Sequence, residues 1–343
     1  VFIGYISGGH MITTPIALTL TDLGWDDHFA TQLHDASEVP VRVTRVHRSA
    51  LSILSNAGAE RLRLFDRGTA QNYAVGDWII PGAIEGDPPR ILGRKTIIRR
   101  RAAGAENLAQ LIAANIDTVF IVSSCNDDFN VARLERYVAL ARAEEVEPVL
   151  LLTKADKVED ADTYRSWATE AFADMSILTI DARSAQTVET LAPWCGVGCT
   201  VALVGSSGVG KSTLTNVLTG RQEDTAEIRE DDARGRHTTT ARSMFRMSTG
   251  GWVVDTPGMR SLRLYDGRDG VDAVFPDIAE LSLTCQFNDC AHLHEPGCSL
   301  LAAVAAGTLD AARVGRWQKL VDEDDRSTES PIAAAERKRA ESR

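Results

Sequence analysis

The sequence lacks both a long apolar run and a recognisable export signal. No stretch of its 343 residues approaches the roughly 20 apolar residues that a membrane-spanning helix needs. The first twenty residues, VFIGYISGGHMITTPIALTL, contain neither a basic leading region nor a clean cleavage site, so they are not typical of a secretory signal. We therefore expect a cytoplasmic protein without a membrane partner.

An excess of positive charge is missing as well. Lys and Arg total 37 against 48 Asp and Glu, and the formal net charge of −11 excludes a protein that holds nucleic acid over its whole surface. Contact with RNA then needs a local basic patch, although such a run can equally be a plain solvated surface. The candidates are Arg90, Arg94, Lys95, Arg99, Arg100 and Arg101, and in the tail Arg337, Lys338 and Arg339.

Composition and hydrophobic patterning indicate a soluble protein of several domains. Hydrophobic residues make up 44% and charged residues 25%, which is ordinary for a globular chain. Short alternating runs separated by turns predict a small β-barrel, whereas continuous apolar runs with helical patterns between them predict a doubly wound parallel sheet. We expect a flexible extension over 1–35, an OB-type barrel over 36–104, an α/β domain over 105–265, a mostly helical domain over 266–322 and a disordered tail over 323–343.

A phosphate-binding loop is the strongest motif. The segment GSSGVGKST follows the strand-like VALV and precedes the helix-like STLTNVL, so the GxxxxGK[ST] pattern stands in its required context. Its glycines let backbone N–H groups face the phosphates, the lysine reaches the β- and γ-phosphates, and the serine ligates Mg²⁺. The residues are Gly205, Ser206, Ser207, Gly208, Val209, Gly210, Lys211, Ser212 and Thr213.

Two segments after this loop are predicted to sense the γ-phosphate. Asp255 begins the segment DTPG at the end of a strand-like run, where it can hold the Mg²⁺ shell while the Gly258 N–H meets the γ-phosphate. The segment GRHTTT supplies a hydroxyl for the second Mg²⁺ contact. We assign Thr239, although the sequence does not separate it from Thr238 or Thr240.

A guanine-reading motif stands before the phosphate loop instead of after it. TKAD (Thr153, Lys154, Ala155, Asp156) follows the apolar run VLLL and looks like the NKxD motif with Thr in place of Asn. The Asp156 carboxylate can accept from guanine N1–H and the guanine amino group, a donor pair that adenine lacks, which disfavours an ATPase. Ser184 and Ala185, after the next strand, resemble the companion loop at the guanine carbonyl. The motif order therefore indicates a circularly permuted GTPase domain over 105–265.

The sequence contains no obvious residue to orient the water that attacks the γ-phosphate. Met259 follows Gly258, where several small GTPases have Gln, and Met cannot orient water. His237 is the remaining catalytic candidate, alongside Lys211, although a plain exposed loop histidine explains it equally well. We expect slow intrinsic hydrolysis that a partner accelerates.

Cysteine and histidine cluster near the C-terminus. Cys285, Cys290, His292 and Cys298 lie within fourteen residues and can close a tetrahedral structural Zn²⁺ site, with His294 as the competing ligand. The remaining cysteines, Cys125, Cys195 and Cys199, are predicted to take no part.

Together these motifs resemble the ribosome small-subunit-dependent GTPases of the RsgA type, from about Leu23 to Leu320. The likeness includes VGDW, ILGRKTIIRR, DFNVARLERY, TKAD, GSSGVGKST, GRHTTT, DTPG and the cysteine pattern ending at Cys298. The resemblance implies an OB-fold, a permuted GTPase domain and a zinc domain. It further implies binding to the 30S subunit late in its assembly, contact with 16S rRNA, and hydrolysis of GTP to GDP that follows ribosome contact. Thr153 departs from the family's Asn, which we expect to loosen the loop.

One alternative belongs to another class. A nucleotide-gated RNA-binding scaffold, in which hydrolysis is incidental, would keep the same motifs, and Met259 favours it. Retention of Lys211, Ser212 and Asp255 favours the enzyme. No feature indicates more than a monomer.

Overall fold

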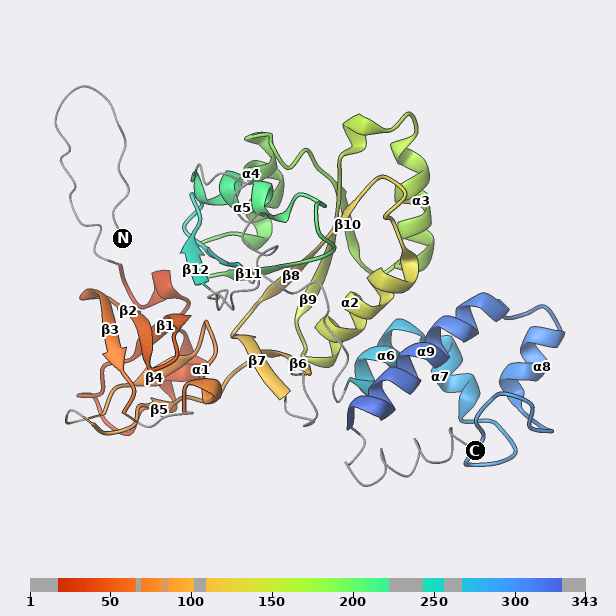
Figure 1. Cartoon of the computed structure of the whole chain (residues 1–343), viewed down its shortest axis with the longest axis horizontal. Helices are drawn as coiled ribbons and strands as arrows, with labels where there is room; N and C mark the ends of the chain where they lie inside the picture. The colour runs from red at the N-terminus through yellow and green to blue at the C-terminus, as the bar shows by residue number, and fades with distance from the viewer. Residues whose placement is uncertain are drawn as a thin grey trace, which may run out of the picture.

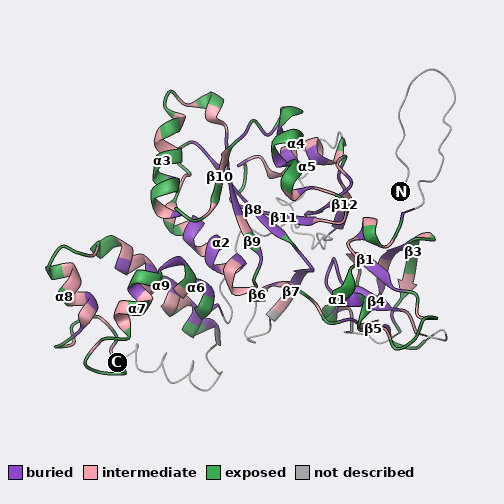
Figure 2. Cartoon of the chain, turned by 180° about the vertical axis from the view of Figure 1, so that it is seen from behind, coloured by how far each residue is buried: buried purple, intermediate pink, exposed green. Residues whose placement is uncertain are grey.

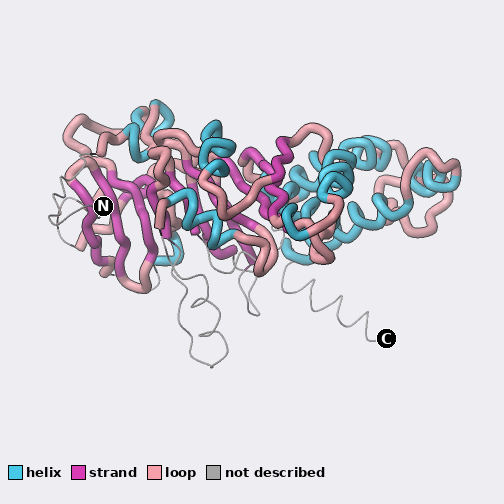
Figure 3. Tube along the Cα trace, turned by 90° about the horizontal axis from the view of Figure 1, so that it is seen from above, coloured by secondary structure: helices cyan, strands magenta, loops and turns pink. Residues whose placement is uncertain are grey.

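Three parts of the chain lie side by side in chain order along the long axis of the molecule (Figure 1). The computed structural model describes residues 18–65, 69–82, 84, 86–101, 109–221, 243–255 and 267–328. Seen from above, strands occupy the first two parts and helices form the third (Figure 3). Buried residues concentrate in the strands of the middle part (Figure 2).

The middle part is the predicted doubly wound sheet. Its strand order is β10-β9-β8-β11-β13-β12, and neighbours run parallel except for β12, which is antiparallel to β13. Each apolar run found in the sequence forms a strand, and β8 and β11 are buried along their whole lengths. The strands are β8 (Thr118–Ser124), β9 (Glu147–Thr153), β10 (Ser176–Thr179), β11 (Thr200–Val204), β12 (Ser243–Arg246) and β13 (Trp252–Asp255).

Helices cover both faces of this sheet, which explains why its central strands contain continuous apolar runs. Ile121 of β8 packs in one core with α2 and α3, whereas its neighbours Phe120 and Val122 pack in another with α4 and α5. Alternate residues of a strand point to opposite faces, so both sets must be apolar. The helices are α2 (Val131–Ala143), α3 (Ala161–Ala171), α4 (Gln186–Leu191) and α5 (Lys211–Thr219).

An antiparallel sheet precedes this domain in the chain. Its strands are β1 (Val41–Val46), β2 (Ala50–Ser55), β3 (Gly58–Arg63), β4 (Trp78–Ile80) and β5 (Arg90–Ile91), paired in the order β3-β2-β1-β4-β5. Within the described ranges no pairing joins β3 to β5, so these strands form an open sheet and a closed OB-type barrel is not confirmed. Arg45 of β1 pairs with Ser243 of β12, which joins the two sheets into one of 11 strands.

The segment before β1 is packed from Leu18 onward, and the expected loose extension therefore does not reach residue 35. Leu23 ends a 3-10 turn, η1 (Thr21–Leu23), and Phe29 lies in α1 (Asp27–Ala30); both are buried. Trp25 packs edge-on against Trp78 with ring centroids 4.8 Å apart. Burial of these aromatic side chains offsets part of the conformational entropy that the segment loses when it is ordered. Residues 1–17 lie outside the described part of the chain.

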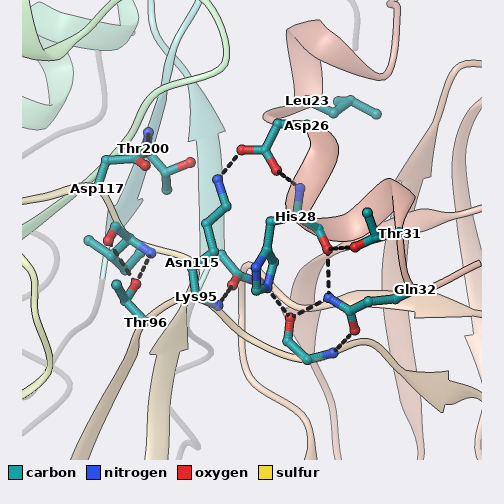
Figure 4. A network of polar contacts seen from close by, with 12 residues as sticks. Leu23, Asp26, His28, Thr31, Gln32, Lys95, Thr96, Asn115, Asp117 and Thr200 are labelled. Carbon is teal, nitrogen blue, oxygen red and sulfur yellow. Dashed lines mark hydrogen bonds and ion pairs between the residues drawn. The ribbon is translucent and has the colours of Figure 1, made fainter.

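A polar network fastens this segment to the central sheet (Figure 4). Asp26 pairs with Lys95, whose backbone N–H donates to Asn115 Oδ1 at 2.9 Å. The Asp117 carboxylate accepts from the Thr200 N–H at 2.7 Å, and burial raises the pKa of Asp117. The hairpin of β6 (Ile97–Arg101) and β7 (Ala109–Ala114) connects the two parts. Because Thr200 begins β11, the network positions the strand that leads into the phosphate loop.

The third part consists of α6 (Arg268–Val274), α7 (Pro276–Ser282), α8 (Ser299–Ala305) and α9 (Ala311–Thr328). It docks on α2: Gly270 lies so close that a Cβ there would stand 2.0 Å from the Ala139 carbonyl oxygen. Arg316 of α9 pairs with buried Glu135 of α2 at 2.9 Å. The last helix, α9, continues to 328, past the expected start of the tail at 323. Among the described residues, no helix is both long and apolar enough to cross a membrane.

Candidate functional site

The predicted phosphate loop joins β11 to α5 at the carboxyl edge of the sheet. Gly205 has φ +141°, and a Cβ there would lie 2.2 Å from the Val122 carbonyl oxygen, so only glycine fits. Gly210, with φ +105°, is the N-cap of α5, which aims the helix N-terminus at the loop. Lys211 Nζ donates to the Gly205 carbonyl at 2.7 Å and also to that of Ser206. Its ammonium group is therefore held at the loop where phosphates would lie.

The guanine motif is tied directly to this loop. The Thr153 hydroxyl donates to the Val209 carbonyl at 2.6 Å and lies 3.3 Å from the Ser123 carbonyl. Thr153 is buried, which protects this bond from water. Thr153 stands where the NKxD motif has Asn, and its hydroxyl reaches the backbone of the phosphate loop.

Asp156 and the second guanine loop meet at the ends of β9 and β10. Lys154 has the left-handed φ of +58° and starts the short turn η3 (Ala155–Lys157), which carries Asp156. Arg183 Nη2 donates to Asp156 Oδ2 at 3.0 Å. Ser184 donates its N–H to the Asp181 carbonyl at 2.9 Å, and Ala185 is the N-cap of α4. Sequence reasoning missed Arg183, although it lies directly before Ser184, which was predicted to contact guanine.

Part of the predicted Mg²⁺ shell lies beside the phosphate loop. Asp255 ends β13, which runs parallel to β11 with Val254 level with Ala202, so the Asp255 backbone lies near the start of the loop. Ser212 lies in the first turn of α5. The other residues predicted to contact Mg²⁺, the γ-phosphate or the attacking water lie outside the described residues: His237, Thr238, Thr239, Thr240 and Gly258. Met259, which was predicted not to orient water, lies outside them as well.

A second arginine missed in the sequence contacts the phosphate loop. Arg133, in the first turn of α2, places Nη1 against the Ser206 hydroxyl and 2.9 Å from Asp128 Oδ1. The Arg133 guanidinium lowers the pKa of the Asp128 carboxyl. The segment DFNVARLERY contains both residues, but nothing in its spacing indicates contact with a loop 73 residues away.

The predicted metal ligands converge in space. The ligand atoms of Cys285, Cys290, His292 and Cys298 all lie within 4.8 Å of one another. His292 Nδ1 is 3.5 Å from both the Cys285 and Cys298 sulfurs, which are 3.9 Å apart. With Zn–S about 2.3 Å and Zn–N about 2.0 Å, tetrahedral geometry separates ligand atoms by roughly 3.5–3.8 Å. The cluster therefore fits one zinc ion, and the competing His294 is not part of it.

A carboxylate shapes the loop that carries these ligands. Glu295 accepts from the backbone N–H groups of Ala291, Leu293 and His294 at 2.9–3.0 Å. These N–H groups, that of His294 foremost, lower the pKa of Glu295 to about 2. These three hydrogen bonds keep the backbone of the loop folded around the four metal-ligand residues. The other cysteines, Cys125, Cys195 and Cys199, lie outside the cluster.

Most of the predicted basic run between residues 90 and 101 is ion-paired, and the side chains of Arg100 and Arg101 lie outside what the structure describes. Four of its side chains are ion-paired, namely Arg90 with Glu38, Arg94 with Asp77, Lys95 with Asp26 and Arg99 with Glu144. An ion-paired cation attracts a phosphate weakly, so these residues serve packing between the parts of the fold. The basic residues of the tail, 337–339, lie outside the described residues.

Comparison with known proteins gives one consistent family. Residues 91–265 match the family model described as RsgA GTPase. A protein of Mesorhizobium japonicum named small ribosomal subunit biogenesis GTPase RsgA is 50% identical over 90% of this chain and 91% of its own length. A Vibrio parahaemolyticus protein, named small ribosomal subunit biogenesis GTPase RsgA 2, is 44% identical over 89% of this chain and 85% of its own length.

Two solved structures share the fold. YjeQ from Thermotoga maritima matches with a TM-score of 0.56 and 25% identity, covering 82% of this chain and 97% of that one. YloQ, described as a circularly permuted GTPase, matches with a TM-score of 0.56 and 23% identity, covering 87% and 98%. The chain belongs to the RsgA GTPase family and is a GTP hydrolase with circularly permuted motifs.

Proposed function

We propose that this GTPase binds the small (30S) ribosomal subunit in the cytoplasm, as a monomer, and assists its late maturation. Contact with the ribosome stimulates GTP hydrolysis, and hydrolysis determines when the protein leaves the subunit. The observation that carries the nucleotide part is the bond from the Thr153 hydroxyl to the Val209 carbonyl, which joins a guanine-reading motif to a phosphate loop. The names of the 50% and 44% identical relatives support the ribosomal part.

In this proposal each loop contacts one part of GTP. Residues 205–213 cradle the phosphates, and Lys211 neutralises the β- and γ-phosphate charge. Ser212, Asp255 and Thr239 hold Mg²⁺, and the Gly258 N–H meets the γ-phosphate. Guanine is read by Thr153, Lys154, Ala155 and Asp156, with Ser184 and Ala185 at its carbonyl. His237 orients the attacking water in the ribosome-bound protein.

The zinc ion has a structural role in this proposal. Cys285, Cys290, His292 and Cys298 fill all four tetrahedral positions, which leaves no open position for water or substrate. The ion would supply folding energy to the loop between α7 and α8 and no chemistry.

A row of cations on the β1–β3 sheet is the surface we assign to 16S rRNA, because Arg90, Arg94, Lys95 and Arg99 of the predicted basic run are ion-paired. Arg45, Ser52 and Arg61 lie directly opposite one another across β1, β2 and β3. Arg63, two residues beyond Arg61, shares its face, and both are exposed. We propose that these strands belong to an OB-type fold, which uses such a face to bind oligonucleotides.

Stimulation by the ribosome is the direct test of the proposed function. Turnover of GTP is expected to rise at least roughly tenfold when purified 30S subunits are added, because a partner that completes a GTPase site supplies large rate factors. Phosphate release is measured with and without 30S subunits, and 50S subunits serve as the control. Equal rates in all three samples would leave the GTPase in place and remove the 30S subunit as its partner.

The basic row is tested by its salt dependence. Replacing Arg61 and Arg63 together by Ala is expected to weaken 30S binding about tenfold and to reduce the salt slope of the affinity by about two, one for each lost phosphate contact. Binding is measured by co-sedimentation over a salt series. Arg165→Ala, at an exposed arginine of α3, is the matched control. An unchanged slope would place the RNA contact elsewhere.

A further inference from the structure

The carboxylate proposed to read guanine already holds a cation. Asp156 Oδ2 accepts from Arg183 Nη2 at 3.0 Å and lies 3.5 Å from Lys157 Nζ. Arg183 comes from the loop after β10, and Asp156 from the loop after β9. These two strands are parallel neighbours, with Thr179 level with Leu152, so their carboxyl ends bring the two loops together.

Arg183 offers the Asp156 carboxylate the same arrangement of hydrogen-bond donors that guanine offers. A guanidinium offers N–H donors side by side in one plane, and it can pair with both oxygens of a carboxylate. Guanine offers N1–H and its amino group in the same planar arrangement. An adenine ring offers no such donor pair. Guanine and Arg183 therefore compete for one acceptor, and adenine does not enter the competition.

Arg183 also has a second anchor that does not depend on Asp156. Its Nε is 3.2 Å from Asp181 Oδ1, and its backbone N–H donates to the same oxygen at 3.0 Å. The Arg183 side chain is 61% exposed and that of Asp156 42% exposed, so nothing packed over the pair prevents its opening. Arg183 can leave Asp156 while its Nε stays on Asp181.

We infer that Arg183 is an internal competitor of guanine, which occupies Asp156 until a guanine nucleotide displaces it and which thereby weakens nucleotide binding. This inference rests on the proposed guanine-reading role of Asp156. Its consequence is faster nucleotide exchange than the guanine contacts alone would allow, because Arg183 re-pairs with Asp156 when the base leaves. The competition lowers the affinity for every base that pairs with Asp156 and leaves the affinity for adenine nucleotides unchanged.

The test compares GDP and ADP binding in three proteins. Arg183→Ala is expected to raise GDP affinity about two- to fivefold, the range that an exposed ion pair produces, and to leave ADP affinity unchanged. Arg183→Lys keeps the charge without the planar fork and is expected to fall between native protein and Arg183→Ala. Affinities and dissociation rates are measured by calorimetry and stopped-flow at low and high salt. The gain is expected to shrink at high salt, where exposed charges are screened.

Controls separate this inference from the site on which it rests. Arg165→Ala removes another exposed arginine, on α3, and is expected to change neither affinity. Asp156→Ala is expected to abolish the preference for GDP over ADP. If that preference is present in the native protein and Arg183→Ala leaves GDP affinity unchanged or lowers it, the competitor role is overturned while the guanine site stands. Equal binding of GDP and ADP by the native protein would overturn the guanine site itself.

Discussion

Lys211→Ala is expected to lower GTP turnover by about two to three orders of magnitude, the loss typical when one preorganised electrostatic donor is removed. The reason lies in the position of Nζ, which is held at the Gly205 and Ser206 carbonyls inside the loop. No other residue of the loop carries a positive charge. Without it, charge that builds on the β- and γ-phosphates in the transition state loses its fixed counter-charge.

The measurement is phosphate release at saturating 30S subunits, together with GTP binding. The fold should survive, because Lys211 is only half-buried and bonds to its own loop, and circular dichroism checks this. Lys319→Ala, at an exposed lysine of α9, is the matched control and should hydrolyse GTP at the native rate. Native turnover in Lys211→Ala would show that the observed hydrolysis belongs to another site or to a contaminant.

Cys298→Ser is expected to remove the bound zinc and to unfold the loop between α7 and α8. Structural zinc sites contribute roughly 10–16 kcal/mol of apparent binding free energy to folding, so loss of one thiolate is severe. Cys298 is the most buried of the four ligands, and it precedes α8, whose Leu300 lies in the main core together with Trp317 of α9. Loss of the ion is therefore expected to loosen the packing between α8 and α9.

Metal content and limited proteolysis measure this outcome. Native protein should carry one zinc ion per chain, and Cys298→Ser little or none, with new cleavage between 283 and 299. His294→Ala is the matched control, because this histidine neighbours the cluster without belonging to it. GTP binding should persist in Cys298→Ser, since the cluster lies in the helical third of the molecule and away from the central sheet (Figure 1). Full zinc content in Cys298→Ser would refute the ligand set.

Much of the fold could be predicted because the relevant signals are local. The apolar runs VLLL (149–152) and VALV (201–204) became parts of β9 and β11, since a strand buried on both faces needs apolar side chains on both. The phosphate loop was predictable for a similar reason, because positive φ favours glycine at Gly205 and Gly210, and the close Val122 carbonyl also restricts Gly205 to glycine. The zinc ligands lie within fourteen residues, so their spacing alone limits the geometry.

The sequence by itself therefore determined the order of motifs, the parallel sheet and the candidate ligands. The tertiary structure alone decided which distant groups meet: Thr153 with Val209, Asp156 with Arg183, and Arg133 with Ser206. The tertiary structure also showed that cations between Arg90 and Arg99 form ion pairs with carboxylates. It further showed that the segment that starts at Leu18 is packed into the core. The physical reason is that periodicity and backbone sterics act over a few residues, whereas a side chain finds its partner only after packing has brought separate loops together.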